Sequence, residues 1–102
     1  MEQLLSKVEA ERSSQALVIF NVLNNHKRLA IVKLLGGVDK MTVTEIYQSL
    51  DLTQTVTSNY LILLREKGVL KSVRDGQKIY YSLAIPKLVE MIAYLESVAL
   101  ES

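Results

Sequence analysis

A group of hydrogen-bonding side chains recurs between residues 54 and 62 at a spacing that places them on one face of a helix. The group consists of Gln54, Thr55, Ser58 and Asn59, followed by Ile62. Amide side chains can bond adenine bidentately, hydroxyls can bond several base edges, and methyl groups can contact thymine. These residue types therefore predict readout of DNA base edges. An ordinary solvated helix face has a similar composition, so the helix by itself leaves that alternative open.

Few other side chains are suited to catalysis or metal binding. The chain has no cysteine and one histidine, His26, which excludes disulfides, thiolate metal sites and Cys–His catalytic pairs. We interpret Met41 and Met91 as packing residues, because thioether metal sites need several converging soft ligands. Asp39 and Glu45 are interpreted as a loop charge and a helix cap. With no glycine-rich phosphate loop either, we predict no enzymatic activity, no cofactor and no metal site.

The charge of the chain is unevenly distributed. The net charge is only +1, but residues 24–87 carry ten basic and five acidic side chains. The flanking segments 1–23 and 88–102 are both net acidic. A basic middle between acidic ends indicates a surface that meets an anion such as nucleic acid. The alternative is a solvated surface whose excess charge has no function.

Length and composition indicate one folded domain. The chain has 102 residues, 49% of them hydrophobic, which excludes a disordered protein. No apolar run approaches the roughly 18 residues that span a bilayer, and the charged N-terminus does not fit a signal peptide. We therefore expect a cytoplasmic protein. The apolar content is slightly more than one small core needs, which favours a second copy that covers the excess.

Four helices are expected in the first two thirds of the chain. The first covers about residues 3–23, where the polar stretch 12–15 indicates either a kink or two abutting helices. The second runs over residues 26–35, and we expect Gly36 and Gly37 to end it in a left-handed conformation. A capping box in residues 42–45 predicts a short helix over 43–50. After a turn at 51–53, with Thr53 as N-cap, a fourth helix runs from 54 to about 67.

The remaining elements are a hairpin and a last helix. Strands are expected near residues 70–74 and 78–83, joined by a turn at Asp75-Gly76. Pro86 suits the first turn of a helix that continues to about residue 100. The expected order is α-α-α-α-β-β-α, a mainly α protein with a β-hairpin.

This order predicts a winged helix-turn-helix. A short capped helix, a three-residue turn and a second helix form a helix-turn-helix, whose second helix enters the DNA major groove. The hairpin that follows is then the wing. Its polar and basic tip fits phosphate oxygens or an adjacent minor groove. The side chains expected to contact the DNA backbone are those of Thr53, Arg74, Gln77 and Lys78.

Three segments together resemble the ArsR/SmtB family of winged-helix repressors. Residues 24–35 (NNHKRLAIVKLL) are similar to the family pattern D-P-T-R-L-x-I-L-x-L-L. Residues 52–61 and 64–70 (LTQTVTSNYL and LREKGVL) resemble L-S-Q-S-T-V-S-R-H-L and L-R-E-A-G-L-V. Residues 74–83 (RDGQKIYYSL) resemble the wing pattern R-E-G-R-x-V-Y-Y-x-L. The similarity spans roughly residues 16–84.

The resemblance implies a homodimeric DNA-binding repressor, with residues 1–102 as one domain that dimerises through helices at 1–23 and 86–100. Pairing about a two-fold axis implies an inverted-repeat operator. The apolar stripe of the last helix suits this role, with the dimerisation residues Leu88, Met91, Ile92, Leu95, Val98 and Ala99.

The chain also departs from the family pattern. Residues 41–45 contain no cysteine where metal-sensing members have one, and the last helix contains no histidine. We therefore expect a metal-independent regulator. Asn59 and Tyr60 stand where Arg and His are common, and the uncharged Asn59 favours adenine. The alternative is a winged helix that binds proteins and not DNA, which the modest total charge and uncharged reading face favour.

Overall fold

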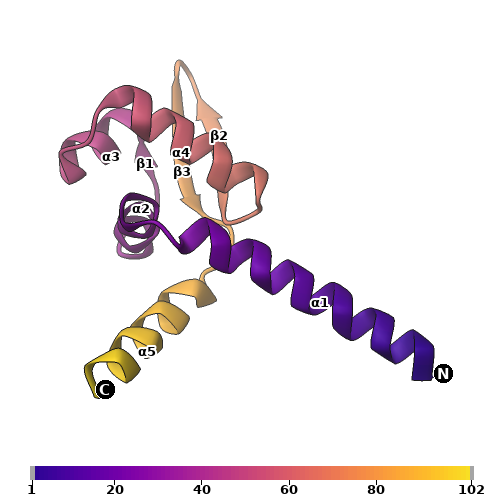
Figure 1. The fold of residues 1–102 in the computed structure, drawn as a ribbon. Helices are drawn as coiled ribbons and strands as arrows, with labels where there is room; N and C mark the ends of the chain where they lie inside the picture. Colours follow the sequence, from indigo (N-terminus) through magenta and orange to yellow (C-terminus); the bar gives the residue numbers. More distant parts are fainter. Residues whose placement is uncertain (1, 102) are drawn as a thin grey trace.

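Caps and turns in the sequence set most boundaries between the helices and strands. The computed structural model describes residues 2–101, with side-chain environments for residues 6–100. In chain order the elements are α1 (Glu2–Leu23), α2 (His26–Gly36), β1 (Met41–Thr42), α3 (Val43–Leu50), α4 (Gln54–Glu66), β2 (Leu70–Asp75), β3 (Lys78–Leu83) and α5 (Lys87–Glu101). Figure 1 shows α2, α3, α4 and the sheet gathered into one body, from which α1 and α5 extend.

Three helices begin at side-chain caps. The Asn25 side chain accepts the N–H groups of the second and third residues after it, and so caps α2. Thr42 and Glu45 form the predicted reciprocal capping box at the start of α3. The Thr53 hydroxyl accepts the N–H of Val56, which confirms it as the N-cap of α4. Each cap satisfies helix N–H groups that have no partner within the helix.

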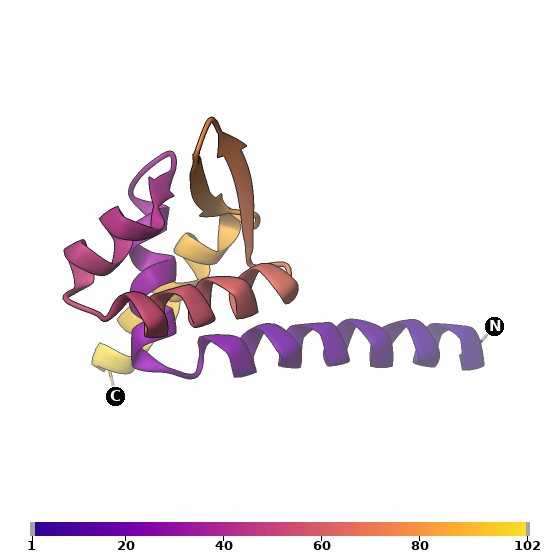
Figure 2. The same cartoon turned by 90° about the horizontal axis from the view of Figure 1, so that it is seen from above.

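The first helix is continuous. The polar stretch at residues 12–15 does not break α1, which runs unbroken from Glu2 to Leu23. Residues 9–18 are all exposed, so polar residues there interrupt no packing and leave the backbone hydrogen bonds intact. Figure 2 shows α1 as a straight arm whose N-terminal part projects beyond the other elements.

The sheet has one strand more than the predicted hairpin. β1 pairs antiparallel with β3, so the strand order is β1-β3-β2. The turn is also one residue later than expected: Asp75 pairs with Lys78, and Gly76-Gln77 connects the strands. Gly76 has a positive φ of 65°, as the first position of a type II′ turn requires. β1 is only two residues long, too short for strand periodicity to reveal.

The two glycines at the end of α2 do not act as predicted. Gly36 is the last residue of α2, and Gly37 follows with φ −94°, so neither is left-handed. The reason for a glycine at position 36 is packing. A Cβ on Gly36 would lie 2.5 Å from the Cγ2 atom of Val89 in α5. The missing side chain therefore lets α5 approach the end of α2.

The core lies between α2, α3, α4 and the sheet. Its fully buried side chains are Ile31, Val32, Leu35, Ile46, Leu61, Leu64, Val69 and Leu70, together with Thr57. The first turns of α5 add Leu88 and Ile92, and the end of α1 adds Val22 and Leu23. Within residues 2–101, no helix is long and apolar enough to cross a membrane.

Candidate nucleic-acid interface

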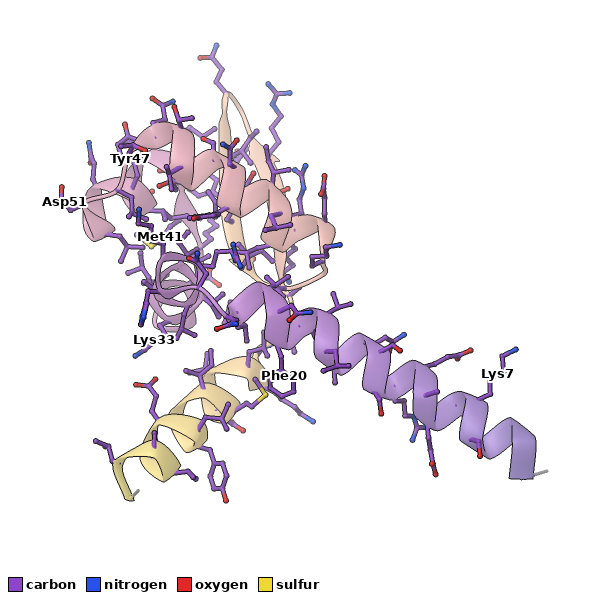
Figure 3. All side chains as sticks on the ribbon, in the orientation of Figure 1. Lys7, Phe20, Lys33, Met41, Tyr47 and Asp51 are labelled. Atoms are coloured by element: carbon purple, nitrogen blue, oxygen red, sulfur yellow. The ribbon has the colours of Figure 1, made fainter. Side chains whose placement is uncertain are left out.

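The turn between α3 and α4 sets the angle of a helix-turn-helix. Asp51 ends α3 in the left-handed conformation, with φ 54° and ψ 46°, which aspartate tolerates better than most residues. The N–H of Leu52 donates to the Tyr47 carbonyl oxygen at 3.0 Å, which closes the last turn of α3. Tyr47 and Asp51 mark this part of the molecule in Figure 3.

The two faces of α4 divide as predicted. Thr57, Leu61 and Leu64 are fully buried against the core, and Tyr60 is half-buried. On the opposite face the five side chains proposed to read bases remain accessible. Gln54, Thr55, Asn59 and Ile62 are exposed, Ile62 by 42%, and Ser58 is half-exposed. We call these five residues the reading face.

The wing lies beside α4 and is joined to it by packing and one side-chain hydrogen bond. The guanidinium of Arg65 donates to the Ser72 hydroxyl of β2 at 3.4 Å. Arg74, Gln77 and Lys78 are all exposed at the outer end of the hairpin, which Figure 1 shows rising beyond α4. The structure thus brings the proposed backbone-contacting cations to the neighbourhood of the helix-turn-helix.

A groove of about 510 Å³ separates the start of α3 from the wing tip, and it contains one acidic group. Glu45, Gln77 and Lys78 are among its lining residues. The backbone N–H and the hydroxyl of Thr42 donate to the Glu45 carboxylate at 3.1 and 2.9 Å. These hydrogen bonds, and to a lesser extent the charge of Lys78, lower the pKa of Glu45. The negatively charged Glu45 carboxylate therefore lies beside the wing. The capping motif predicted its role at the start of α3 but not this position.

The predicted dimerisation residues of α5 fall into two groups. Leu88 and Ile92 are buried in the core of their own chain, so their packing does not require a second copy. Met91 is half-buried, whereas Leu95, Val98 and Ala99 are exposed, Leu95 by 49%. An apolar stripe cannot reveal which of its turns faces the chain's own core.

A groove of about 450 Å³ runs between the end of α1 and α5. Its apolar lining includes Phe20, Leu29, Met91 and Leu95, and Figure 3 shows Phe20 on the part of α1 nearest α5. An ion pair also joins α2 to α5, with the ammonium of Lys33 3.0 Å from the Glu96 carboxylate and both side chains about half-exposed.

The residues considered as metal ligands do not converge. His26 is exposed at the start of α2, Met41 is buried in the core, and Met91 is half-buried on α5. Among the described residues, no three His, Asp or Glu side chains come together in a metal-binding arrangement.

Comparisons with known proteins agree with this architecture. The sequence profile described as "Bacterial regulatory protein, arsR family" matches residues 25–72, from the cap of α2 into β2. The chain is 30% identical over 94 residues to the HTH-type transcriptional regulator YgaV of Escherichia coli, covering 92% of this chain and 94% of YgaV. It is 34% identical over 92 residues to the transcriptional repressor PagR of Bacillus anthracis, covering 90% and 92% of the two chains.

A solved structure is similar over most of its length. The homodimeric winged helix-turn-helix DNA-binding domain of Mb0332 from Mycobacterium bovis superposes with a TM-score of 0.80. It is 27% identical in sequence, and the match covers 91% of this chain and 85% of that one. On its motifs, its fold and these relatives, the chain belongs to the arsR family of bacterial regulatory proteins, a family of DNA-binding transcription regulators and not of enzymes.

Proposed function

We propose that this protein is a sequence-specific DNA-binding repressor that acts as a homodimer and does not depend on a metal. The observation that carries the proposal is the exposed polar reading face of α4 beside a wing with a basic tip. The repressor role is supported by the likeness to PagR, which is named as a transcriptional repressor.

In the proposed complex the N-terminal half of α4 enters the major groove. Gln54 and Asn59 carry amides that suit adenine, and the hydroxyls of Thr55 and Ser58 suit several base edges. The exposed Ile62 offers methyl groups to thymine. Their position on the exposed side of a helix anchored by a buried opposite face supports this assignment.

The wing and the start of α4 would hold the DNA backbone. Arg74 and Lys78 supply cations and Gln77 an amide, all exposed at the hairpin end. The Thr53 hydroxyl already accepts the Val56 N–H, which leaves its own proton to donate to a phosphate. Contacts of this kind fix register but carry no sequence information.

Dimerisation is proposed through α1 and α5, with residues 1–102 as one domain. The supporting observation is the apolar surface that these helices leave exposed. On α1, Leu17 is 60% and Phe20 48% exposed, and on α5 Leu95 and Val98 are also exposed. Mb0332 is described as homodimeric. Two-fold pairing would present two reading faces about one DNA turn apart, to an inverted-repeat operator.

Metal independence is proposed from the ligands that the chain carries. It has no cysteine and one histidine, whereas most tight transition-metal sites use thiolate and imidazole ligands. A titration with zinc, cadmium or arsenite that shifts the DNA affinity would contradict this part of the proposal.

Fluorescence anisotropy with duplexes from the protein's own upstream region tests the central proposal. We expect tight binding to one inverted repeat, weaker binding to a shuffled duplex, and an affinity that falls linearly with log salt concentration. A monomer with no preference between the two duplexes would overturn the proposal. Capture of a protein partner together with no DNA affinity would favour the winged-helix interaction module.

A further inference from the structure

The side chain of Arg28 lies where three helices meet. It projects from the first turn of α2 and is half-buried. Its Nε donates to the Val22 carbonyl oxygen at 2.6 Å, and its Nη2 donates to the Asn21 carbonyl oxygen at 3.3 Å. Its guanidinium carbon is 5.4 Å from the centre of the Tyr60 ring. One residue of α2 therefore contacts the end of α1 and the inner side of α4.

The contact with α1 satisfies a need of that helix. The last carbonyl groups of a helix have no partner within it, and the C-terminal end favours a cation. The last turn of α1 contains no basic residue. Arg28 supplies the missing cation from the next helix, and its planar guanidinium can hold two carbonyls in a fixed geometry. Together with Val22 and Leu23, which are buried in the core, it ties the end of α1 to α2.

The contact with α4 adds to the buried face of that helix in holding its rotation. Tyr60 is half-buried on the inner side of α4 and directly follows Asn59 on the reading face. A cation over the face of an aromatic ring is attracted by its quadrupole and holds the ring in place. Asn59 and Tyr60 lie about 100° apart around the axis of α4. A rotation of the whole helix that moves Tyr60 away from Arg28 therefore also turns Asn59.

We propose that Arg28 is a positioning residue that couples the angle of α1 to the orientation of α4. This inference rests on the proposed function, in which two copies pair through α1 and α5. In such a dimer the angle between α1 and α4 sets the separation of the two reading faces. Arg28 then determines which spacing between operator half-sites the protein accepts, although it touches no DNA.

The experiment uses inverted-repeat duplexes that share one half-site, selected with the wild-type protein, and differ only in spacer length. Arg28→Gln removes the cation and is compared with Lys27→Gln, which removes the charge of an exposed neighbour on the same helix. We expect Arg28→Gln to lose about tenfold in affinity at the preferred spacing, the size of a lost charge-assisted hydrogen bond. Its affinity at other spacings stays nearly unchanged, so the spacing preference flattens. Lys27→Gln keeps the preference.

A second pair of variants covers the case in which Arg28→Gln does not fold. Tyr60→Phe keeps the ring and the spacing preference, whereas Tyr60→Leu removes the ring and flattens the preference. Circular dichroism and light scattering identify folded dimers, to which the comparison is restricted.

The inference and the proposed function fail in different ways. If the wild-type protein selects no half-site, the proposed function is wrong. If it selects one with a preferred spacing, and folded Arg28→Gln or Tyr60→Leu dimers keep that preference, the positioning role of Arg28 is wrong. An equal loss at every spacing assigns Arg28 to general stability and also overturns the inference.

Discussion

Replacement of Thr57 by valine is expected to stabilise the protein. Thr57 lies in the first turn of α4 with no exposed surface, and its hydroxyl oxygen has no hydrogen-bond partner among the described residues. The backbone N–H of Thr57 is already used, donating to the Thr53 carbonyl at 3.1 Å. The folded state therefore removes the hydroxyl from water without compensation, and an apolar group of the same shape avoids that cost.

The magnitude follows from the chemistry of the replacement. An unsatisfied buried polar group costs about 1–3 kcal/mol, and valine keeps the β-branched shape while exchanging the hydroxyl for a methyl. We expect the free energy of unfolding of Thr57→Val to rise by about 1–2 kcal/mol. For a domain near this size, each kcal/mol raises Tm by roughly 4–8 °C. DNA affinity stays unchanged, because Thr57 lies opposite the reading face.

Urea unfolding at one fixed protein concentration measures the change, since the stability of a dimer depends on concentration. Thr57→Ser keeps the hydroxyl and loses the methyl group, so it is expected to be less stable than the wild type. Thr55→Val makes the same exchange at an exposed position of the same helix and should change stability by less than about 0.5 kcal/mol. If Thr57→Val proves less stable than the wild type at an unchanged m-value, the hydroxyl has a partner and the reasoning is wrong.

Three further predictions concern the reading face, the α2–α5 contact and the α3 cap. Asn59→Ala should relax base preference at one operator position at a cost of about 1–3 kcal/mol of binding free energy. Lys78→Ala should weaken binding to all duplexes alike and reduce the slope of log affinity against log salt concentration by about 1. Equal effects of the two variants on specificity would contradict the assignment of Asn59 to bases and Lys78 to phosphates. Gly36→Ala should cost about 1 kcal/mol less in a Val89→Ala background, measured by a double-mutant cycle, because the 2.5 Å contact is then removed; additive effects would contradict it. The pKa of Glu45 is lower in the folded state than in the unfolded state. The ionised Glu45 carboxylate therefore stabilises the folded state above the unfolded pKa, and this stabilisation is lost as the pH falls through the folded pKa. The stability difference from Glu45→Gln, which keeps a capping-box residue type, should therefore shrink on acidification, and a pH-independent difference would refute this.

Local hydrogen bonding explains why much of the helix-turn-helix could be predicted from sequence. The caps at Thr42 and Thr53 each use a side chain and a backbone N–H three residues away, so the motif is complete within a few residues. Gly68 ends α4 at φ 79°, again a local requirement. The buried and exposed faces of α4 follow from helical periodicity in the same way.

Contacts between distant residues explain what the sequence could not reveal. β1 exists because Met41 pairs with Tyr81, and two residues carry no periodic signal. Position 36 needs a glycine because Val89 of α5 packs against it, and not because the chain makes a left-handed turn there. Helical periodicity places Thr57 on the inner face of α4, but only the fold shows that its hydroxyl meets no hydrogen-bond partner among the described residues.

The same distinction between local and distant contacts applies to the proposed base contacts and to the proposed geometry of the dimer. The exposure of the proposed reading face follows from local signals on α4, so the hypothesis that these residues read bases could be formed from the sequence alone. In the proposed dimer the relation between the two copies depends on the direction of α1, whose last carbonyls accept hydrogen bonds from Arg28, six and seven residues away. In the proposed dimer, half-site sequence is therefore read by side chains of α4 itself, whereas half-site spacing depends on contacts between helices that are distant in the sequence.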